Sequence, residues 1–185
     1  MHKLKFVGAF GLPQDEDTFV LSLCDENEER AVSIVTNRSL AHEFRDFQDE
    51  TVDTQDRLPF VLCSLIKKGL GFHHNIQFHG VKDVGLQAQL VDLLTDERIP
   101  LRQDEAVFLS VISGVEMYAD LDVFRYFSTP VNKKSMQVAL PILSLPDKML
   151  QVALKEAINQ ENYESASFIR DEINRRKQQK VGKSE

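Results

Sequence analysis

The chain has 185 residues, of which 42% are hydrophobic and 28% charged, and its formal net charge is −7. This composition is ordinary for a folded protein and excludes a wholly disordered or collagen-like chain. The excess of acids argues against general electrostatic binding of nucleic acid, because Lys and Arg supply the attraction to phosphate. With no apolar run near the roughly 20 residues of a membrane helix and no signal-peptide pattern, the sequence predicts a cytoplasmic protein without membrane contact.

Strand-like patterns recur through the first two thirds of the chain, at residues 3–10, 18–24, 30–35, 76–81, 86–94, 98–101 and 115–118. The first three follow one another closely and predict an antiparallel meander. The turn-forming residues 82–85 join the fourth and fifth in a predicted hairpin.

Helical spacing appears between these strands, in stretches that begin near residues 39, 57, 104 and 120. The expected N-caps are Asn37 or Ser39, Asp104 and Asp120, because short polar side chains accept bonds from the free amides of a first turn. The helix that begins at 104 is expected to end at Gly114 and to pack Val107, Val111 and Ile112 against the sheet. Since strands and helices are interspersed without a regular βαβ order, the predicted fold class is α+β, with a mainly antiparallel sheet and packed helices.

The C-terminal part of the chain has a different pattern. From Asp147, the expected cap, apolar residues recur at helical intervals, and a break at residues 160–162 divides them into two helices, an αα-hairpin. Such a pair is too small to bury an apolar face alone. The predicted organisation is an α+β domain at 1–128, a linker at 129–146, the hairpin at 147–178 and a flexible basic tail at 179–185.

The hairpin resembles the UVR motif, named for the excision-repair proteins UvrB and UvrC. The matching residues are Leu154, Ala157, Ile158, Asn162-Tyr163-Glu164, Ala166 and Ile169-Arg170-Asp171-Glu172-Ile173. A plain amphipathic hairpin would supply the apolar spacing but not the two longer runs. The resemblance implies protein–protein contact, often with another copy, and no catalysis.

Spacing within each helix predicts one apolar seam for docking. The residues expected to bind a partner are Leu154, Ile158, Tyr163, Ile169, Arg170 and Ile173. Exposed strand edges and this seam together predict a homo-oligomer, most simply a two-fold dimer.

The first domain is similar to the bifunctional nuclease domain. Residues 102–109, followed by 115–118, resemble the family pattern Arg-Pro-Ser-Asp-Ala-Ile-Ala-Leu and its next strand, and residues 82–90 resemble the family hairpin. The similarity covers roughly residues 1–128, and a nuclease-like domain followed by a UVR hairpin recurs in bacterial members. It implies hydrolysis of DNA or RNA phosphodiesters with a divalent metal.

Three residues near 104 carry this hypothesis. Arg102 is the expected phosphate clamp, and Asp104 and Glu105 are the expected catalytic acids and ligands of Mg²⁺ or Mn²⁺. The alternative is structural, with Asp104 as a cap, Glu105 at the helix dipole and Arg102 paired with an acid. The family's His in the helix start at 54–58 is Gln55 here, which can neither transfer a proton nor bind metal as imidazole does.

The remaining metal-binding residue types favour structural roles. His73 and His79 have the same strand parity and His74 lies beside them, but no metal motif surrounds them, so surface histidines are the expected interpretation. Cys24 and Cys63 each lie in an apolar run and are expected to be buried, reduced thiols.

Two functions therefore remain open. One is a metal-dependent nuclease acting on DNA or RNA. The other is a non-catalytic interaction or regulatory protein in which the nuclease-like domain is a scaffold, favoured by Gln55 and the acidic surface. Surface Lys and Arg beside Glu105 in the folded domain would favour the enzyme, and their absence would favour the interaction protein.

Overall fold

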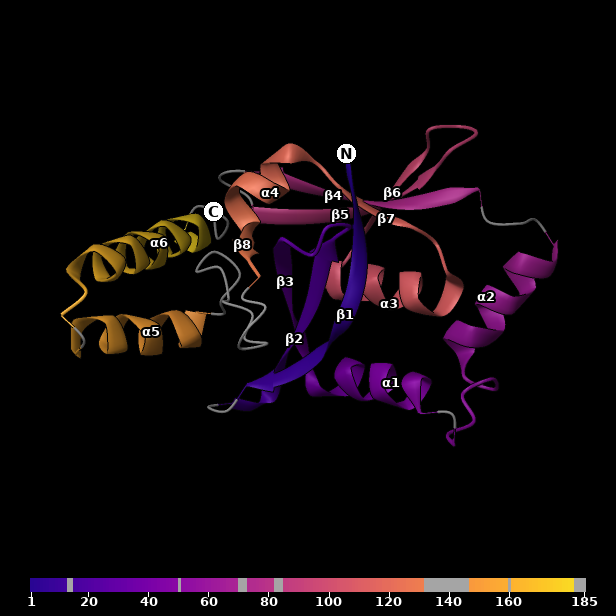
Figure 1. Ribbon diagram of the computed structural model, residues 1–185, viewed down its shortest axis with the longest axis horizontal. Helices are drawn as coiled ribbons and strands as arrows, with labels where there is room; N and C mark the ends of the chain where they lie inside the picture. Colours follow the sequence, from indigo (N-terminus) through magenta and orange to yellow (C-terminus); the bar gives the residue numbers. More distant parts are fainter. Residues whose placement is uncertain are drawn as a thin grey trace. The chain divides into compact units, whose positions relative to one another are not determined.

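The computed structural model describes residues 1–12, 15–49, 51–69, 73–81, 85–131, 147–159 and 161–181. The chain divides into two compact units, residues 1–139 and 140–185. In the described part, the first unit contains eight strands and four helices, and the second contains two helices (Figure 1). No helix in this part is both long and apolar enough to cross a membrane.

The predicted meander is confirmed. Strands β1 (His2–Leu12), β2 (Asp15–Asp25) and β3 (Arg30–Asn37) pair antiparallel in sequence order. Their alternating apolar residues supply buried side chains such as Leu21 and Val32 to the core. The short strand β8 (Ser128–Pro130) extends this half by pairing with β3, where the sequence predicted only a connector.

The other half of the sheet contains β4 (His74–Val81), β5 (Gly85–Asp92), β6 (Arg98–Leu101) and β7 (Met117–Ala119). The strand order β6-β5-β4-β7-β1-β2-β3-β8 joins both halves in one sheet. Every pairing is antiparallel except that of β4 with β7. The predicted α+β class with a mainly antiparallel sheet is therefore confirmed, whereas most of the predicted turn at 82–85 lies outside the described residues.

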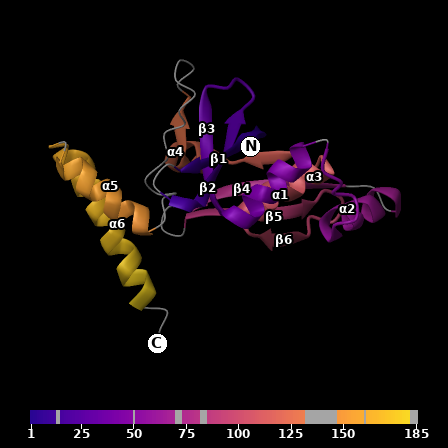
Figure 2. The ribbon, with the colours of Figure 1, turned by 90° about the horizontal axis from the view of Figure 1, so that it is seen from below.

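Helices α1 (Arg38–Gln48), α2 (Leu58–Gly69) and α3 (Gln103–Ser113) lie on one side of β4 and β5, with α3 between α1 and these strands (Figures 1 and 2). Phe44 is the centre of this layer, because its ring stacks on Phe6 at 5.0 Å and meets the edge of Phe108 at 5.1 Å. Val107 is fully buried as predicted, but Val111 and Ile112 remain partly exposed. Phe108, Ala106 and Ser110 are buried in α3 in addition to Val107.

Helix α4 (Leu121–Phe127) packs against β3, β4 and β8. It starts close to Gly80, where a Cβ atom would lie only 2.7 Å from backbone atoms of Asp122 and Val123. Glycine is therefore required at this point of β4. Asp120 caps α4 as predicted, by accepting a bond of 2.8 Å from the amide of Val123.

Some of the other predicted helix ends are confirmed and others are not. Asn37 caps α1 through the amide of Leu40, and Gly114 ends α3 in the left-handed conformation. The prediction that Asp104 caps α3 is wrong, since the N-cap is Arg102 and Asp104 lies inside the first turn. Asp147, expected as a cap, is the first residue of its helix.

The second unit is a hairpin of α5 (Asp147–Asn159) and α6 (Tyr163–Val181). Leu150, Ala157, Ala166 and Ile169 form its buried core. The turn is a Schellman type, in which the amides of Glu161 and Asn162 bond to the carbonyls of Ile158 and Ala157. Helix α6 continues to Val181, three residues beyond the predicted end of the hairpin at 178.

Candidate functional site

The three residues expected to be catalytic lie at the start of α3, directly after β6. The Nη2 atom of Arg102 donates to Oδ2 of Asp104 at 2.8 Å, and its Nη1 atom lies 3.6 Å from Oε1 of Glu105. The hydrogen bond to Asp104 raises the pKa of the Arg102 guanidinium. The structure thus brings the three side chains together, with the guanidinium contacting both carboxylates.

Asp104 is tied to the rest of the fold by further bonds. Only 5% of this residue is exposed. Its Oδ2 atom also accepts the hydroxyl of Thr36 on β3 at 3.1 Å, and its Oδ1 atom accepts the amide of Glu105 at 3.0 Å. Both carboxylate oxygens are therefore already bonded, and a positive charge lies beside one of them. These contacts do not suit a divalent metal ligand, which would compete with three donors for the same oxygens.

Two different hollows flank this cluster. Arg102 and Asp104 line a cavity of about 510 Å³ together with Leu86, Leu101 and other residues of β5 and β6. Glu105 lines a second cavity, of about 660 Å³, between α1, α2 and α3. The two acids expected to share a metal thus face different cavities. Among the described residues, no group of three or more His, Cys, Asp or Glu side chains is arranged to hold a metal ion.

Gln55, which stands where the nuclease pattern has a histidine, lies shortly before α2 in the chain. Gln55 is exposed, and its backbone amide donates to Oδ1 of Asp53 at 3.0 Å. It belongs to neither of the two cavities beside Arg102 and Glu105. Helix α2 begins at Leu58, close to the predicted start at 57.

The three histidines do not form one site. His73 precedes β4, so the strand parity that it has with His79 does not place the two on one face of a strand. His74 lies 3.7 Å from a carboxylate oxygen of Asp92. The Nδ1 atom of His79 lies 3.1 Å from Oδ2 of Asp120, which also caps α4.

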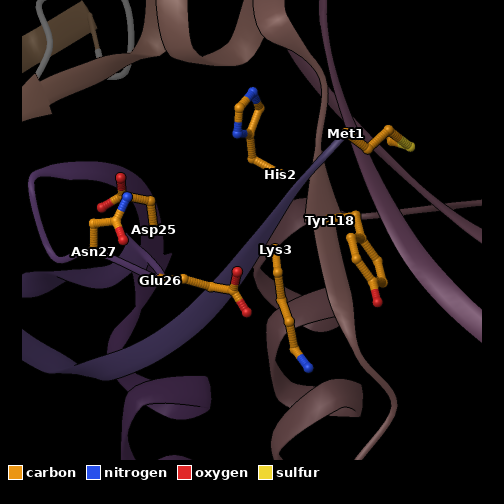
Figure 3. Close-up of a pocket in the computed structure, with 7 residues that line it drawn as sticks. All are labelled: Met1, His2, Lys3, Asp25, Glu26, Asn27 and Tyr118. Carbon is orange, nitrogen blue, oxygen red and sulfur yellow. The ribbon is translucent and has the colours of Figure 1, made fainter.

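A third cavity, of about 460 Å³, lies at the start of β1 beside the β2–β3 turn and β7 (Figure 3). Lys3 bonds to Glu116, and the hydroxyl of Tyr118 donates to the same carboxylate at 2.6 Å. The bond from Lys3 lowers the pKa of Glu116, and the bond to Glu116 raises the pKa of Tyr118. Sequence reasoning missed this cluster, because its partners are more than 100 residues apart. Glu116 thus accepts from both Lys3 and Tyr118 beside this cavity.

Both cysteines are buried and neither is in a disulfide, as predicted. Burial raises the pKa of the Cys24 thiol. Cys63 lies on α2 and lines the cavity that also contains Glu105. Thiols held in the protonated form are poor nucleophiles, so Cys24 has the structural role expected for it.

The six residues expected to bind a partner fall into two groups. Leu154, Ile169 and Ile173 pack within the hairpin's own core, so the single outward seam predicted from their spacing does not form as one surface. Ile158, Tyr163 and Arg170 are exposed, with 68% of Tyr163 accessible. Val152 and Phe168 are exposed apolar residues of the hairpin as well. Spacing alone cannot say which side of an amphipathic helix is covered.

The hairpin also contains a buried carboxylate. Glu172 accepts bonds of 2.8 Å from Arg175 and 2.6 Å from Arg176, and Arg176 lies 3.2 Å from Asp147 at the start of α5. Burial opposes the charge on Glu172, but the two arginines outweigh it and lower the pKa of the carboxyl. Helical spacing of three and four residues could have signalled this cluster.

Residues 150–179 match the family model of the UvrB/uvrC motif, UVR. The match covers α5 from Leu150 onward, the turn and most of α6, so the resemblance seen in the sequence is confirmed for this part of the chain. It supports an interaction role, with protein or DNA. No curated protein matches the chain. Neither result supports the resemblance of the first unit to the bifunctional nuclease domain.

Proposed function

We propose that the chain is a non-catalytic interaction protein in which the UVR hairpin contacts a protein partner and the α+β unit is a scaffold. The observation that carries this proposal is the UVR match on a hairpin that closes its own core and leaves large side chains outside. Docking then requires no unfolding of the hairpin, because Leu150 and Ile169 already pack inside it.

The contact surface that we propose lies at the turn of the hairpin. Ile158 near the end of α5 and Tyr163 at the start of α6 flank residues 160–162, and about half of Ile158 is exposed. Tyrosine is enriched among the residues that dominate binding energies, since it offers a large apolar ring and a polar hydroxyl. Arg170, also exposed, adds charge to the same helix as Tyr163.

Charges in the first unit support a scaffold role. Among the described residues that line the cavity beside Glu105, Arg57 is the only cation. It bonds to Glu43 and Asp46 at 2.8 Å each. Arg102 is similarly paired with Asp104 and Glu105. A nucleic-acid site needs cations that can face phosphates, and these two arginines already have carboxylate partners.

The test compares two hairpin variants in affinity capture after cross-linking in the native cells. Replacing both turn residues, Ile158→Ala with Tyr163→Ala, is expected to remove the partner bands that the wild-type chain retains. Val152→Ala is the matched control, because Val152 is also exposed on α5 but lies in its first half. Circular dichroism must show the same helix content in all three proteins. Retention of the same bands by the double variant would contradict the proposal.

The second candidate is hydrolysis of DNA or RNA phosphodiesters, with Mg²⁺ or Mn²⁺ supplied from solution. One observation favours it: the side chain of Arg102 is 62% exposed beside a cavity of about 510 Å³, where a phosphate could reach it. Its weakness is the bonding of Asp104, whose two oxygens are occupied by protein donors. This candidate predicts cleavage that requires metal and that depends on Arg102 and Glu105.

A further inference from the structure

The outer edge of β3 is covered by β8 along only part of its length. Strand β8 pairs with residues 30–32, and β3 continues for five residues beyond them. Among the described residues, no strand pairs with this outer edge at residues 33–37. Val35 is partly exposed there, although its neighbours Ile34 and Thr36 are buried. The edge of the sheet is therefore open at Val35.

The backbone of Val35 directs its polar groups toward this open edge. The amide of Val131 donates to the carbonyl of Glu29 at 2.9 Å, so the carbonyl of the residue just before β3 points to the β8 side. Along a paired strand, the N–H and C=O groups of successive residues alternate between its two neighbours. Val35 lies six residues after Glu29 and therefore points both groups to that same side. An unpaired donor and acceptor at a strand edge form a template for another strand.

The two strands that end the sheet are protected from such pairing by proline. The amide of Asp92 on β5 donates to the carbonyl of Glu97 at 2.9 Å, so alternation places the backbone of Pro100 on the outer side of β6. The same alternation, counted from Val131, places Pro130 on the outer side of β8. Proline has no N–H group and cannot donate to an added strand. Residues 33–37 contain neither proline nor a charged side chain, so this stretch of β3 is the unprotected one.

A hollow lies along the same edge. Val35 and Asp104 both line the cavity of about 510 Å³, and Asp104 bonds to the hydroxyl of Thr36. The side chains of Val35 and Thr36 point to opposite faces of β3, because successive side chains of a strand alternate. A cavity lined by Val35 and by the partner of Thr36 therefore follows the edge of the strand and not one face. The apolar residues on its opposite wall come from β5 and β6 and are Leu86, Ala88, Pro100 and Leu101.

We propose that an extended peptide segment of a protein partner binds here by adding a strand to β3 at Val35. The free N–H and C=O groups of Val35 pair with the backbone of the peptide, and every second side chain of the peptide enters the hollow. In this mode of recognition, main-chain bonds provide affinity and the pockets for alternate side chains provide specificity. The apolar wall selects an aliphatic side chain at the position nearest Leu86 and Leu101. This binding role of the α+β unit uses no residue of α5 or α6, so it and the function proposed for the hairpin fail separately.

A displayed library of random heptapeptides, selected on the immobilised full chain, supplies the probe, and fluorescence anisotropy measures its binding. Val35→Pro removes the outward N–H group and leaves the bonds between β3 and β2 in place, as an edge position allows. It is expected to weaken binding by about tenfold or more, since a main-chain hydrogen bond is lost and the proline ring obstructs the added strand. Val35→Ala is the matched control, because it keeps the amide and should change the affinity by less than about threefold. Failure to select any peptide, or selected peptides that bind Val35→Pro as well as the wild-type chain, would overturn the proposal.

Amide hydrogen exchange of the wild-type chain locates the bound peptide, and it decides the question if Val35→Pro loses its wild-type circular dichroism. The amide of Val35 should exchange at least about tenfold more slowly with saturating peptide, whereas that of Ile34, which faces β2, should be protected with or without it. The same peptide with all its backbone N–H groups methylated should neither bind nor protect Val35. Ile158→Ala with Tyr163→Ala should bind the peptide as the wild-type chain does. Unchanged exchange at Val35 would overturn the proposal, and protection that rises with protein concentration alone would overturn it by assigning the edge to a second copy.

Discussion

Asp104 in the first unit and Glu172 in the hairpin are both carboxylates of which only 5% is exposed, and each bonds to arginine. Resemblance to a nuclease assigned catalysis to the first. The second belongs to a UVR match, a motif for which no catalysis is expected. An arginine beside a buried carboxylate therefore does not by itself identify an active site, because the same arrangement stabilises a helical hairpin.

The two clusters differ in what surrounds the arginine. Arg175 and Arg176 are mostly covered and lie on the same helix as Glu172, so that cluster is closed. Arg102 is 62% exposed, and Asp104 also bonds to Thr36 on a strand 68 residues earlier. The carboxylate of Asp104 thus fastens α3 to the sheet, while its arginine faces solvent. Any chemistry at this cluster must come from Arg102 and Glu105.

The largest expected effect is on stability at Asp104. Asp104→Ala removes the acceptor of the Thr36 hydroxyl and of the Glu105 amide, and leaves that hydroxyl buried without this partner. The free energy of unfolding of the first unit should fall by about 2–4 kcal/mol, measured by urea unfolding with circular dichroism. Glu105→Ala, an exposed neighbour, is the control and should change it by less than about 1 kcal/mol. Equal effects would refute the anchoring role of Asp104.

A smaller effect is expected at Glu172. Glu172→Gln keeps the shape but removes the charge of the carboxylate to which Arg175 and Arg176 both bond, while Arg176 retains Asp147 at 3.2 Å. This loss should cost the hairpin about 1–3 kcal/mol. Amide hydrogen exchange of α5 and α6 should then quicken roughly tenfold or more. Asp171→Asn, which changes an exposed acid on the same helix, should leave exchange nearly unchanged. Unchanged exchange in Glu172→Gln would make this cluster irrelevant to folding.

Acid should weaken the hairpin through the same residue. Because the folded-state pKa of Glu172 is lowered, its contribution is complete above the ordinary pKa of glutamate and is lost as the pH falls through the folded value. Protection of α6 amides should therefore decrease below about pH 4. The decrease should be smaller in Glu172→Gln measured at the same pH. A parallel decrease in both proteins would assign the acid sensitivity to other groups.

The smallest effect is expected at Arg102. Its exposed guanidinium pairs with Asp104, which has two other donors, and with the exposed carboxylate of Glu105. Arg102→Ala should therefore lower the free energy of unfolding by no more than about 1 kcal/mol. Urea unfolding of Arg102→Ala, compared with that of Asp104→Ala, checks this. A loss as large as that of Asp104→Ala would mean that the arginine, and not Thr36, is the main partner of the carboxylate.

Local chemistry explains which parts of the fold could be predicted. Asn37, Asp120 and Gly114 act within three or four residues of their positions, and all three predictions are confirmed. The β8 strand contains only three residues and forms because β3 offers a free edge, which no local pattern reveals. Asp104 looks like a cap in sequence, but its bond to Thr36 comes from a distant strand.

The candidate sites likewise contain parts that the sequence predicts and parts that it does not. Apolar spacing and the UVR runs located the hairpin, yet spacing could not tell that Ile169 points into the hairpin core while Tyr163 lies outside. Helix α2 has a broad apolar face that includes Phe60 and Leu62, and the sequence does not reveal which part of that face the fold covers. Only the packing of Phe60 on Phe47 and Phe108 separates the covered side from the exposed one.

We propose that the Arg102–Asp104–Glu105 cluster supports the fold and does not cleave nucleic acid. The most direct measurement incubates the full chain with end-labelled single-stranded DNA and RNA, with and without Mg²⁺ or Mn²⁺, beside Arg102→Ala with Glu105→Gln. We predict no metal-dependent cleavage by the wild-type chain above that of the double variant. Metal-dependent cleavage that disappears in a double variant with wild-type circular dichroism would contradict the account.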